Sequence, residues 1–166
     1  RRVLFRSNNN HQHEKEITFI QSAIGSSNEE VEFHLSSGHE SRPGHFQQEF
    51  YGSSSIRKPV KTLEYWPDMK FTTQLVKSTK FDTFYDEKEL GIIDFIWADI
   101  QGAEIDLIDA GQKALSNTRF LYTEYSNDEL YEGEVGLDVI LSKLPGNWSI
   151  VEDYGSDILL KNLSFD

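Results

Sequence analysis

The sequence predicts an α/β protein whose mostly parallel sheet ends in a C-terminal antiparallel hairpin. Three observations carry this prediction: the almost continuously apolar run Ile92 to Ala98, the alternation of strand and helix patterns after it, and two apolar runs flanking a turn near the C-terminus. An apolar run without alternation is typical of a strand buried on both faces, as in a parallel sheet between helices. Alternating strands and helices favour the α/β class, with the helices on the faces of the sheet.

The first elements follow from local patterns. Ile17 to Ala23 and Val31 to Leu35 alternate apolar and polar residues, which predicts two strands separated by the turn signal Gly25 to Asn28. These strands are expected to form a hairpin or to lie as neighbours in a sheet. Phe71 to Val76 is a further short strand, and Phe81 to Leu90 reads as a short helix.

The remaining elements continue the alternation. Ile92 to Ala98, including Trp97, is expected to lie in the core. A helix with one apolar stripe is expected over Leu107 to Leu115, followed by a strand over Phe120 to Tyr125. A second amphipathic helix is expected over Leu137 to Leu144 and is ended by Pro145-Gly146. A closing hairpin is expected over Trp148 to Leu160.

Composition limits the possible partners. The 166 residues are 37% hydrophobic and 13% aromatic, which is a folding composition, and the chain contains no cysteine. A net charge of -12 argues against a nucleic acid or an anionic membrane as partner, because both are bound by Lys and Arg. No apolar run reaches bilayer length and no signal-peptide pattern is present, so a cytoplasmic location is expected.

Two segments stand apart from this pattern. Arg1 to Ser7 resembles a sequencing-library adapter translated into protein, so residues 1–7 are expected to be a non-native scar, with a natural basic N-terminus as the alternative. Ser36 to Ser55 is rich in Ser, Gly and His and has no periodicity. Connections of this length are usually functional or disordered.

Polar residues at the ends of the predicted strands are the candidates for a site, because ligands of α/β sheets bind beyond the carboxyl ends of the strands. Asp99 follows a strand directly and is either a catalytic carboxylate or the N-cap of the next helix. Glu104 lies in the first turn of that helix, where the dipole favours a carboxylate. Glu124 ends the next strand and is placed to meet Asp99, where two carboxylates would bind a hydroxyl group or a divalent cation.

The segment Ile93 to Glu104 resembles the signature of FkbM-type methyltransferases, in which a strand runs into Asp, an apolar residue, Glu or Gln, Gly, Ala and Glu. The resemblance extends to further segments in the same order. Ile17 to Leu35, Gly52 to Ser55, Lys80 to Tyr85 and Leu121 to Glu124 are similar to the family's hairpin, Gly/Ser segment, short acidic helix and following strand.

The resemblance implies a Rossmann-like class I methyltransferase fold, S-adenosylmethionine as cofactor, and O-methylation of a sugar, glycan or secondary metabolite. The family's Gly-rich loop and ribose-binding acid are not found here and are expected upstream of Asn8. Residues 8–166 are therefore expected to be the C-terminal portion of a methyltransferase domain that lacks its first strands, and to be inactive or nearly so in isolation.

The resemblance and the strand-end positions together assign expected roles. Catalysis falls to Asp99 and Glu124. The cofactor is expected at Ser22, Ala23, Asp99, Gln101 and Gly102, and the acceptor at Glu104, Asn127, Ser54 and His45. No metal site is expected.

Two other interpretations remain open. The first is a non-catalytic α/β domain with a binding or structural role, in which the acids serve the fold. The second is a metal-dependent hydrolase that uses Asp99 and Glu124, against which stands the lack of a histidine at a ligand-like spacing.

Overall fold

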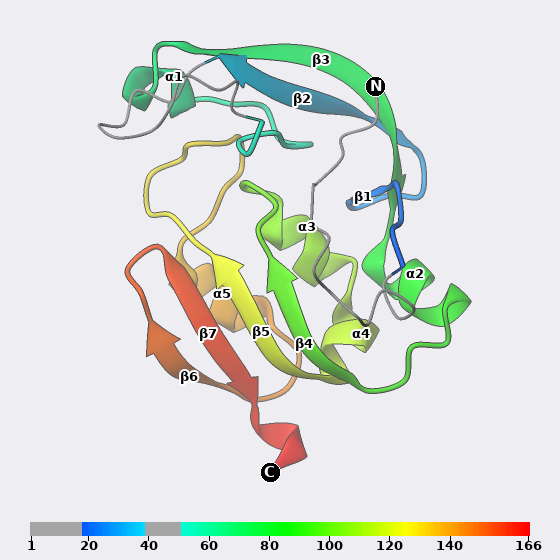
Figure 1. The fold of residues 1–166 in the computed structure, drawn as a ribbon. Coiled ribbons are helices and arrows are strands. Elements are labelled where there is room, and N and C mark those ends of the chain that lie inside the picture. The colour runs from blue at the N-terminus through cyan, green and yellow to red at the C-terminus, as the bar shows by residue number, and fades with distance from the viewer. Residues whose placement is uncertain (1–17, 39–50) are drawn as a thin grey trace, which may run out of the picture.

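The computed structural model describes residues 18–38 and 51–166, which form two small sheets (Figure 1). The three-stranded sheet has the order β1–β3–β2, and the four-stranded sheet has the order β4–β5–β7–β6. The suspected scar at residues 1–7 and the acceptor residue His45 lie outside the described residues, so both stay predictions.

The three-stranded sheet contains β1 (Ala23–Ile24), β2 (Glu30–Gly38) and β3 (Met69–Thr79). The prediction of a strand over Ile17 to Ala23 is wrong for residues 18–22, where Phe19 is 78% exposed and the apolar alternation finds nothing to pack against. The expectation that these two strands form a hairpin or lie as neighbours is wrong as well, because β3 lies between them. Both β1 and β2 pair with β3, in parallel and antiparallel directions respectively.

The four-stranded sheet contains β4 (Ile93–Ala98), β5 (Thr118–Glu124), β6 (Trp148–Asp153) and β7 (Asp157–Asn162). The expected antiparallel hairpin is present as β6 and β7. The expectation of one mostly parallel sheet is corrected to two mixed sheets. Among the described strands, only β1–β3 and β4–β5 are parallel pairs. Strand β2 pairs antiparallel with β3, and β7 pairs antiparallel with both β5 and β6.

The helices are short: α1 (Thr62–Tyr65), α2 (Phe81–Glu87), α3 (Glu104–Asp109), α4 (Gln112–Ser116) and α5 (Leu137–Lys143), with a 3-10 turn at Leu163–Phe165. None of the helices in the described ranges is long and apolar enough to cross a membrane.

The predicted helix over Leu107 to Leu115 is divided into α3 and α4 at Gly111. A Cβ at Gly111 would lie 2.8 Å from Cδ1 of Phe81, so the missing side chain lets α2 pack at this break. The carboxylate of Asp82 on α2 accepts hydrogen bonds from the backbone N–H groups of Lys113 (3.2 Å) and Ala114 (2.9 Å). These bonds satisfy donors in the first turn of α4.

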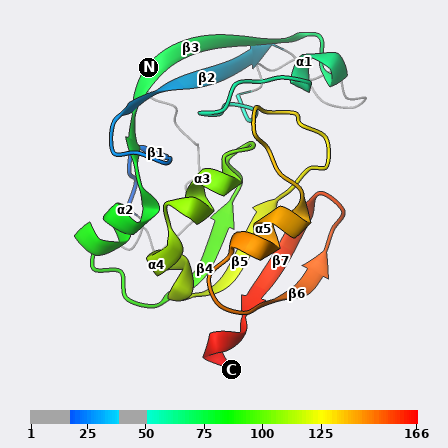
Figure 2. The same ribbon diagram turned by 180° about the vertical axis from the view of Figure 1, so that it is seen from behind.

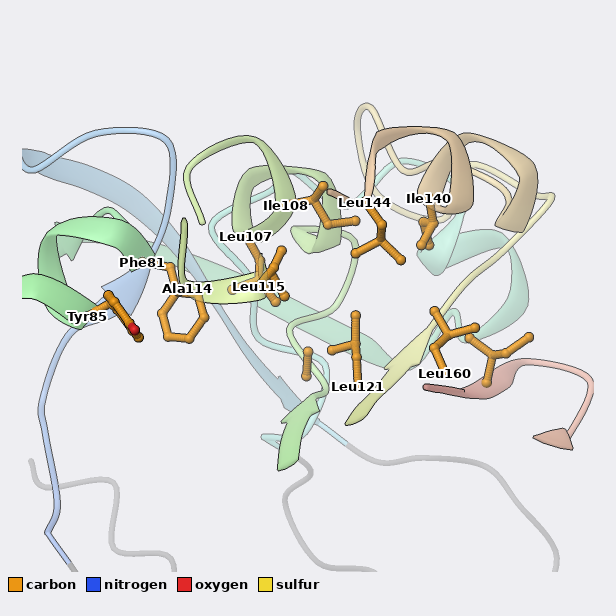
Figure 3. Packing of buried hydrophobic residues seen from close by; sticks show 12 residues of the cluster. Phe81, Tyr85, Leu107, Ile108, Ala114, Leu115, Leu121, Ile140, Leu144 and Leu160 are labelled. Atoms are coloured by element: carbon orange, nitrogen blue, oxygen red, sulfur yellow. The ribbon is translucent and has the colours of Figure 1, made fainter. Parts of the chain in front are cut away.

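The core lies between one face of the four-stranded sheet and the helices. Figure 2 shows α3, α4 and α5 on this face, and Figure 3 shows Ile108 and Ile140 above Leu121 and Leu160. These four side chains are at most 1% exposed. Full burial of such a side chain contributes about 2 kcal/mol to folding.

The opposite face of the four-stranded sheet is not covered by the described helices (Figure 1). Phe95 is 51% exposed and Trp97 is 72% exposed, so the expectation that β4 is buried on both faces, with Trp97 in the core, is wrong in this structure. The Trp97 ring contacts Tyr122, which in turn contacts Tyr154, with centroids 5.9 and 6.0 Å apart. The result is an exposed aromatic row on the sheet.

Candidate functional site

Two carboxylates meet where β4 and β5 end. These strands run in parallel with Ala98 opposite Thr123, so the next residues, Asp99 and Glu124, emerge side by side. The side-chain amide of Gln101 donates hydrogen bonds to Asp99 Oδ1 (2.7 Å) and to Glu124 Oε2 (2.8 Å). One amide group thus holds both predicted catalytic acids.

Asp99 does not cap the following helix. Helix α3 begins at Glu104 with Ala103 as its N-cap residue, and no side chain caps it. Asp99 is an exposed residue whose carboxylate accepts the hydrogen bond from Gln101. Helix capping therefore does not explain the carboxylate of Asp99 at the end of β4.

Glu124 has a strongly perturbed acidity. Burial is the main cause that raises its pKa to about 7, and the negative charges of Asp99, Asp157 and Glu134 and a hydrogen bond with Asp99 raise it further. A neighbouring carboxylate disfavours a second negative charge. At neutral pH Glu124 is therefore partly protonated.

A third acid lies behind this pair. Glu104 is 4% exposed, and burial, followed by the charges of Glu124 and Glu134, raises its pKa to about 8. Its Oε1 atom has no hydrogen-bond partner among the described residues. Glu104 is thus largely protonated at neutral pH and retains an unused oxygen.

The raised pKa of Glu104 makes stability fall as pH rises. The folded state keeps the proton up to about pH 8, whereas the unfolded state releases it near pH 4.5, so ionisation opposes folding within this window. We expect the variant Glu104→Gln to match the wild type at pH 4 and to exceed its free energy of unfolding by about 3 kcal/mol at pH 7.

Urea denaturation across this pH range measures the difference. The exposed Glu87→Gln serves as control and should change little at any pH. A constant difference between Glu104→Gln and the wild type from pH 4 to pH 8 would contradict the assignment.

The turn between β4 and α3 has an unusual backbone. Gln101 has a φ of 52° and Gly102 a φ of 86°. The buried Ser55 hydroxyl donates to the Gln101 carbonyl oxygen at 2.7 Å, and Tyr131 packs so closely on Gly102 that a Cβ there would lie 2.6 Å from the Tyr131 Cβ. Sequence reasoning named Gln101 and Gly102 but attached no role to Ser55.

The other predicted site residues make their contacts elsewhere. Ser22 precedes β1 in the three-stranded sheet and bonds through its hydroxyl to the Thr79 hydroxyl (2.9 Å), with Ala23 beside it in the strand. The Ser54 hydroxyl accepts from the Ser36 backbone N–H at 3.0 Å. Asn127 is exposed. Their roles toward cofactor or acceptor remain predictions.

A cavity of about 310 Å³ lies between β2, the segment after Ser55, and α3. His34, Arg57 and Asp106 contribute to its wall, and the Arg57 guanidinium makes two 2.7 Å bonds to the Asp106 carboxylate. The His34 N–H donates to the Ser55 carbonyl oxygen at 2.7 Å. Ser55 therefore connects the cavity wall to the turn that holds the carboxylates.

Loss of the Arg57 side chain should destabilise the protein. The Asp106 side chain is 7% exposed, so Arg57→Ala leaves a buried carboxylate without its counter-charge. Because Arg57 itself is partly solvated, we expect a loss of about 2 kcal/mol in the free energy of unfolding, measured by urea denaturation. Lys143→Ala removes an exposed pair with Asp109 and should cost less than about 1 kcal/mol. Equal losses in the two variants would contradict this.

The fold is that of an α/β protein, and acidic side chains gather at the carboxyl ends of two neighbouring parallel strands. The chain belongs to the FkbM methyltransferase domain family, whose match extends over residues 3–158. The resemblance of the sequence to this family is thereby confirmed.

A curated relative agrees with the family match. The chain is 38% identical over 145 residues to the 2-O-methyltransferase NoeI of Sinorhizobium fredii (strain NBRC 101917 / NGR234), a match that covers 84% of this chain. The matched region spans 57% of that relative, little more than half of its length. A search of solved structures gives no match.

The metal-dependent hydrolase interpretation gains no support. Within residues 18–38 and 51–166, no group of three or more His, Cys, Asp or Glu side chains is arranged to hold a metal ion. The family match also points to another reaction.

Proposed function

We propose that the protein transfers a methyl group from S-adenosylmethionine to a hydroxyl group of a sugar, glycan or secondary metabolite. The observation that carries this proposal is the pair of carboxylates, Asp99 and Glu124, joined by one amide at the ends of parallel strands. The family match supports methyl transfer, and the pair supplies the acid–base chemistry that an alcohol acceptor requires.

Glu124 is the proposed general base. Methyl transfer to an alcohol requires alignment of the acceptor oxygen and removal of its proton. A base works best when its pKa lies near the working pH, and burial together with Asp99 holds the pKa of Glu124 at about 7. In this account a carboxylate oxygen of Glu124 takes the hydroxyl proton, and Asp99 orients the acceptor oxygen.

The residues around the pair suit a cationic cofactor. Asp99, Glu104, Glu124 and Glu134 gather there, and the ion pairs of the described residues use other acids. The unpartnered Oε1 of the buried Glu104 adds an acceptor for a hydrogen bond. When bound, S-adenosylmethionine supplies an electrophilic methyl group on a positively charged sulfonium. Asp99 and the Gln101–Gly102 turn are the residues that we propose to hold it.

An uncharged acceptor rich in hydroxyl groups fits the neighbouring cavity. Both acidic and basic side chains line its wall and offer donors and acceptors: Glu32, His34, Arg57, Lys58, Asp106 and Glu132. The name of the relative states methylation of an oxygen at position 2 of its own substrate. We therefore favour a sugar hydroxyl as the acceptor.

The described residues leave the aromatic face of β4 open, and we propose that a further part of the methyltransferase domain packs there. Phe95 and Trp97 on that face are more than half exposed, which is costly in a folded enzyme. The greater length of the relative supports this proposal. Residues 8–166 would then form the C-terminal portion of the domain and would show little activity alone.

Transfer of a tritiated methyl group tests the proposal. The full-length protein is incubated with labelled S-adenosylmethionine and a panel of glycans and simple glycosides, and label in the glycan fraction is counted. We expect label in acceptors with a free hydroxyl and none when that hydroxyl is already methylated. Equal labelling of free and blocked acceptors would contradict O-methylation.

A further inference from the structure

The side-chain amide of Gln101 has a single orientation that satisfies its surroundings. Its Nε2 group has two hydrogens, and these are used on Asp99 Oδ1 and Glu124 Oε2. Its Oε1 atom accepts from the Tyr131 hydroxyl at 3.2 Å. A flipped amide would point its oxygen at the two carboxylates, so these two acids determine the orientation.

Tyr131 is fixed by contacts on both its side chain and its backbone. It is 3% exposed, and its hydroxyl shares its single proton between the Ser53 carbonyl oxygen at 2.8 Å and Gln101 Oε1 at 3.2 Å. Burial raises the pKa of Tyr131 to about 12, so the hydroxyl keeps its proton at all working pH values. Its backbone N–H donates to Glu134 Oε2 at 3.1 Å, which fixes the loop after β5.

The backbone of Gln101 is also fixed in one conformation by contacts with other segments. A non-glycine residue at a φ of 52° is in the left-handed region, which is strained for most side chains. The Ser55 hydroxyl holds the Gln101 carbonyl oxygen in this conformation from a distance of 46 residues in sequence. Strain maintained by several long-range contacts is typical of functional turns.

We propose that Gln101 and Tyr131 are positioning residues, in which the Tyr131 hydroxyl contacts the oxygen of the Gln101 amide and this amide holds the Asp99 and Glu124 carboxylates together. The sequence also assigns Gln101 to the cofactor, and that role stays a prediction. A role of the Asp99–Glu124 pair in catalysis rests on the proposed function, whereas the hydrogen bonds that hold the two side chains together do not.

The groups that face the pair explain why a donor is needed there. Glu134 on the loop after β5 and Asp157 on β7 both add negative potential at Glu124, whereas the buried Glu104 on α3 is largely protonated at neutral pH. A hydrogen bond to a carboxylate favours its charged form. Without the Gln101 donor, the pair should hold its proton more tightly.

Carbon-13 NMR titration of the glutamate carboxyls in the full-length protein tests this directly. In Gln101→Met, which keeps the length of the side chain but has no donor, we expect the Glu124 pKa to rise by about 1 unit. Tyr131→Phe removes only the hydroxyl and should raise it in the same direction by a smaller amount.

Two matched controls separate positioning from general loss of packing. Tyr85→Phe removes another buried hydroxyl, which donates to the Gly91 carbonyl oxygen at 2.7 Å. Gln112→Met removes an amide that donates to the carbonyl oxygens of Ile108 and Lys143. Neither should move the Glu124 pKa. An unchanged pKa in both Gln101→Met and Tyr131→Phe would overturn the proposal.

Methyl-transfer kinetics then separate this inference from the proposed function. If the pair acts as the base, the acidic limb of the pH profile of kcat/KM should move upward with the NMR pKa in each variant. A shifted pKa with an unmoved limb would keep the positioning of the pair but exclude it as the base. A profile that moves equally in Tyr85→Phe would overturn the specific role of Tyr131.

Discussion

Glu124→Gln should lower the rate of methyl transfer by about 10²- to 10⁴-fold, because it removes the proposed base without changing the size of the side chain. Gln cannot accept the proton of the acceptor hydroxyl. The measurement is the initial rate of label transfer from S-adenosylmethionine by the full-length protein at pH 8. Glu152→Gln, an exposed acid on β6, is the control and should retain the wild-type rate.

The same base predicts how the wild-type rate depends on pH. Only the deprotonated form of Glu124 can take a proton, so kcat/KM should rise about tenfold per unit below pH 7 and level off above it. A rate of Glu124→Gln within about threefold of the wild type, together with a flat profile from pH 5 to pH 8, would be incompatible with this role.

Gly102→Ala should cause the largest loss of stability of the substitutions considered. Gly102 has a φ of 86°, which is strained for any residue with a Cβ, and that Cβ would lie 2.6 Å from the Tyr131 Cβ. Strain and overpacking together should lower the free energy of unfolding by about 4 kcal/mol, which corresponds to a fall of about 12 °C in Tm. Calorimetric melting of the full-length protein measures it.

Gly91→Ala isolates the contribution of the backbone. Gly91 has a φ of 63°, but a Cβ there would meet nothing within 4 Å. Its Tm should fall by only a few degrees, since the collision with a neighbour is missing. If Gly91→Ala and Gly102→Ala lowered Tm equally, close packing against Tyr131 would not be a feature of the turn.

The position of the carboxylates was predictable from the sequence because it depends on a local rule. A residue that ends a parallel strand emerges at the same sheet edge as its neighbour, which places Asp99 beside Glu124 without further information. The buried state of Glu104 was not predictable in this way. First-turn acids are usually solvated, and only the packing of α3 against the sheet removes this one from water.

The contacts that support the site could not be derived from local patterns. Ser55 and Tyr131 reach Gln101 across 46 and 30 residues, and no spacing in the sequence signals such pairs. The Gly/Ser segment is among the candidates that the sequence predicts, but the prediction names Ser54, whereas Ser55 makes the contact with Gln101. Distinguishing adjacent serines requires the direction of each side chain, which the backbone path alone determines.

The apolar run of β4 shows a second limit. Its composition predicts burial on both faces, but Phe95 and Trp97 point to a face that the described helices leave open. The apolar composition of a strand indicates that both of its faces are buried in the folded protein, but it does not indicate which segment packs on each face. The prediction therefore fails for the described residues while still indicating where additional structure is expected to pack.

Calorimetric titration of S-adenosylhomocysteine into the full-length protein tests the central claim most directly. We expect saturable binding at one site, retained in the Glu124→Gln variant because that side chain serves proton transfer. A folded full-length protein that gives no binding heat at any temperature between 10 and 35 °C, as well as no ligand-dependent rise in Tm, would contradict the claim that this acidic site serves a methyltransferase.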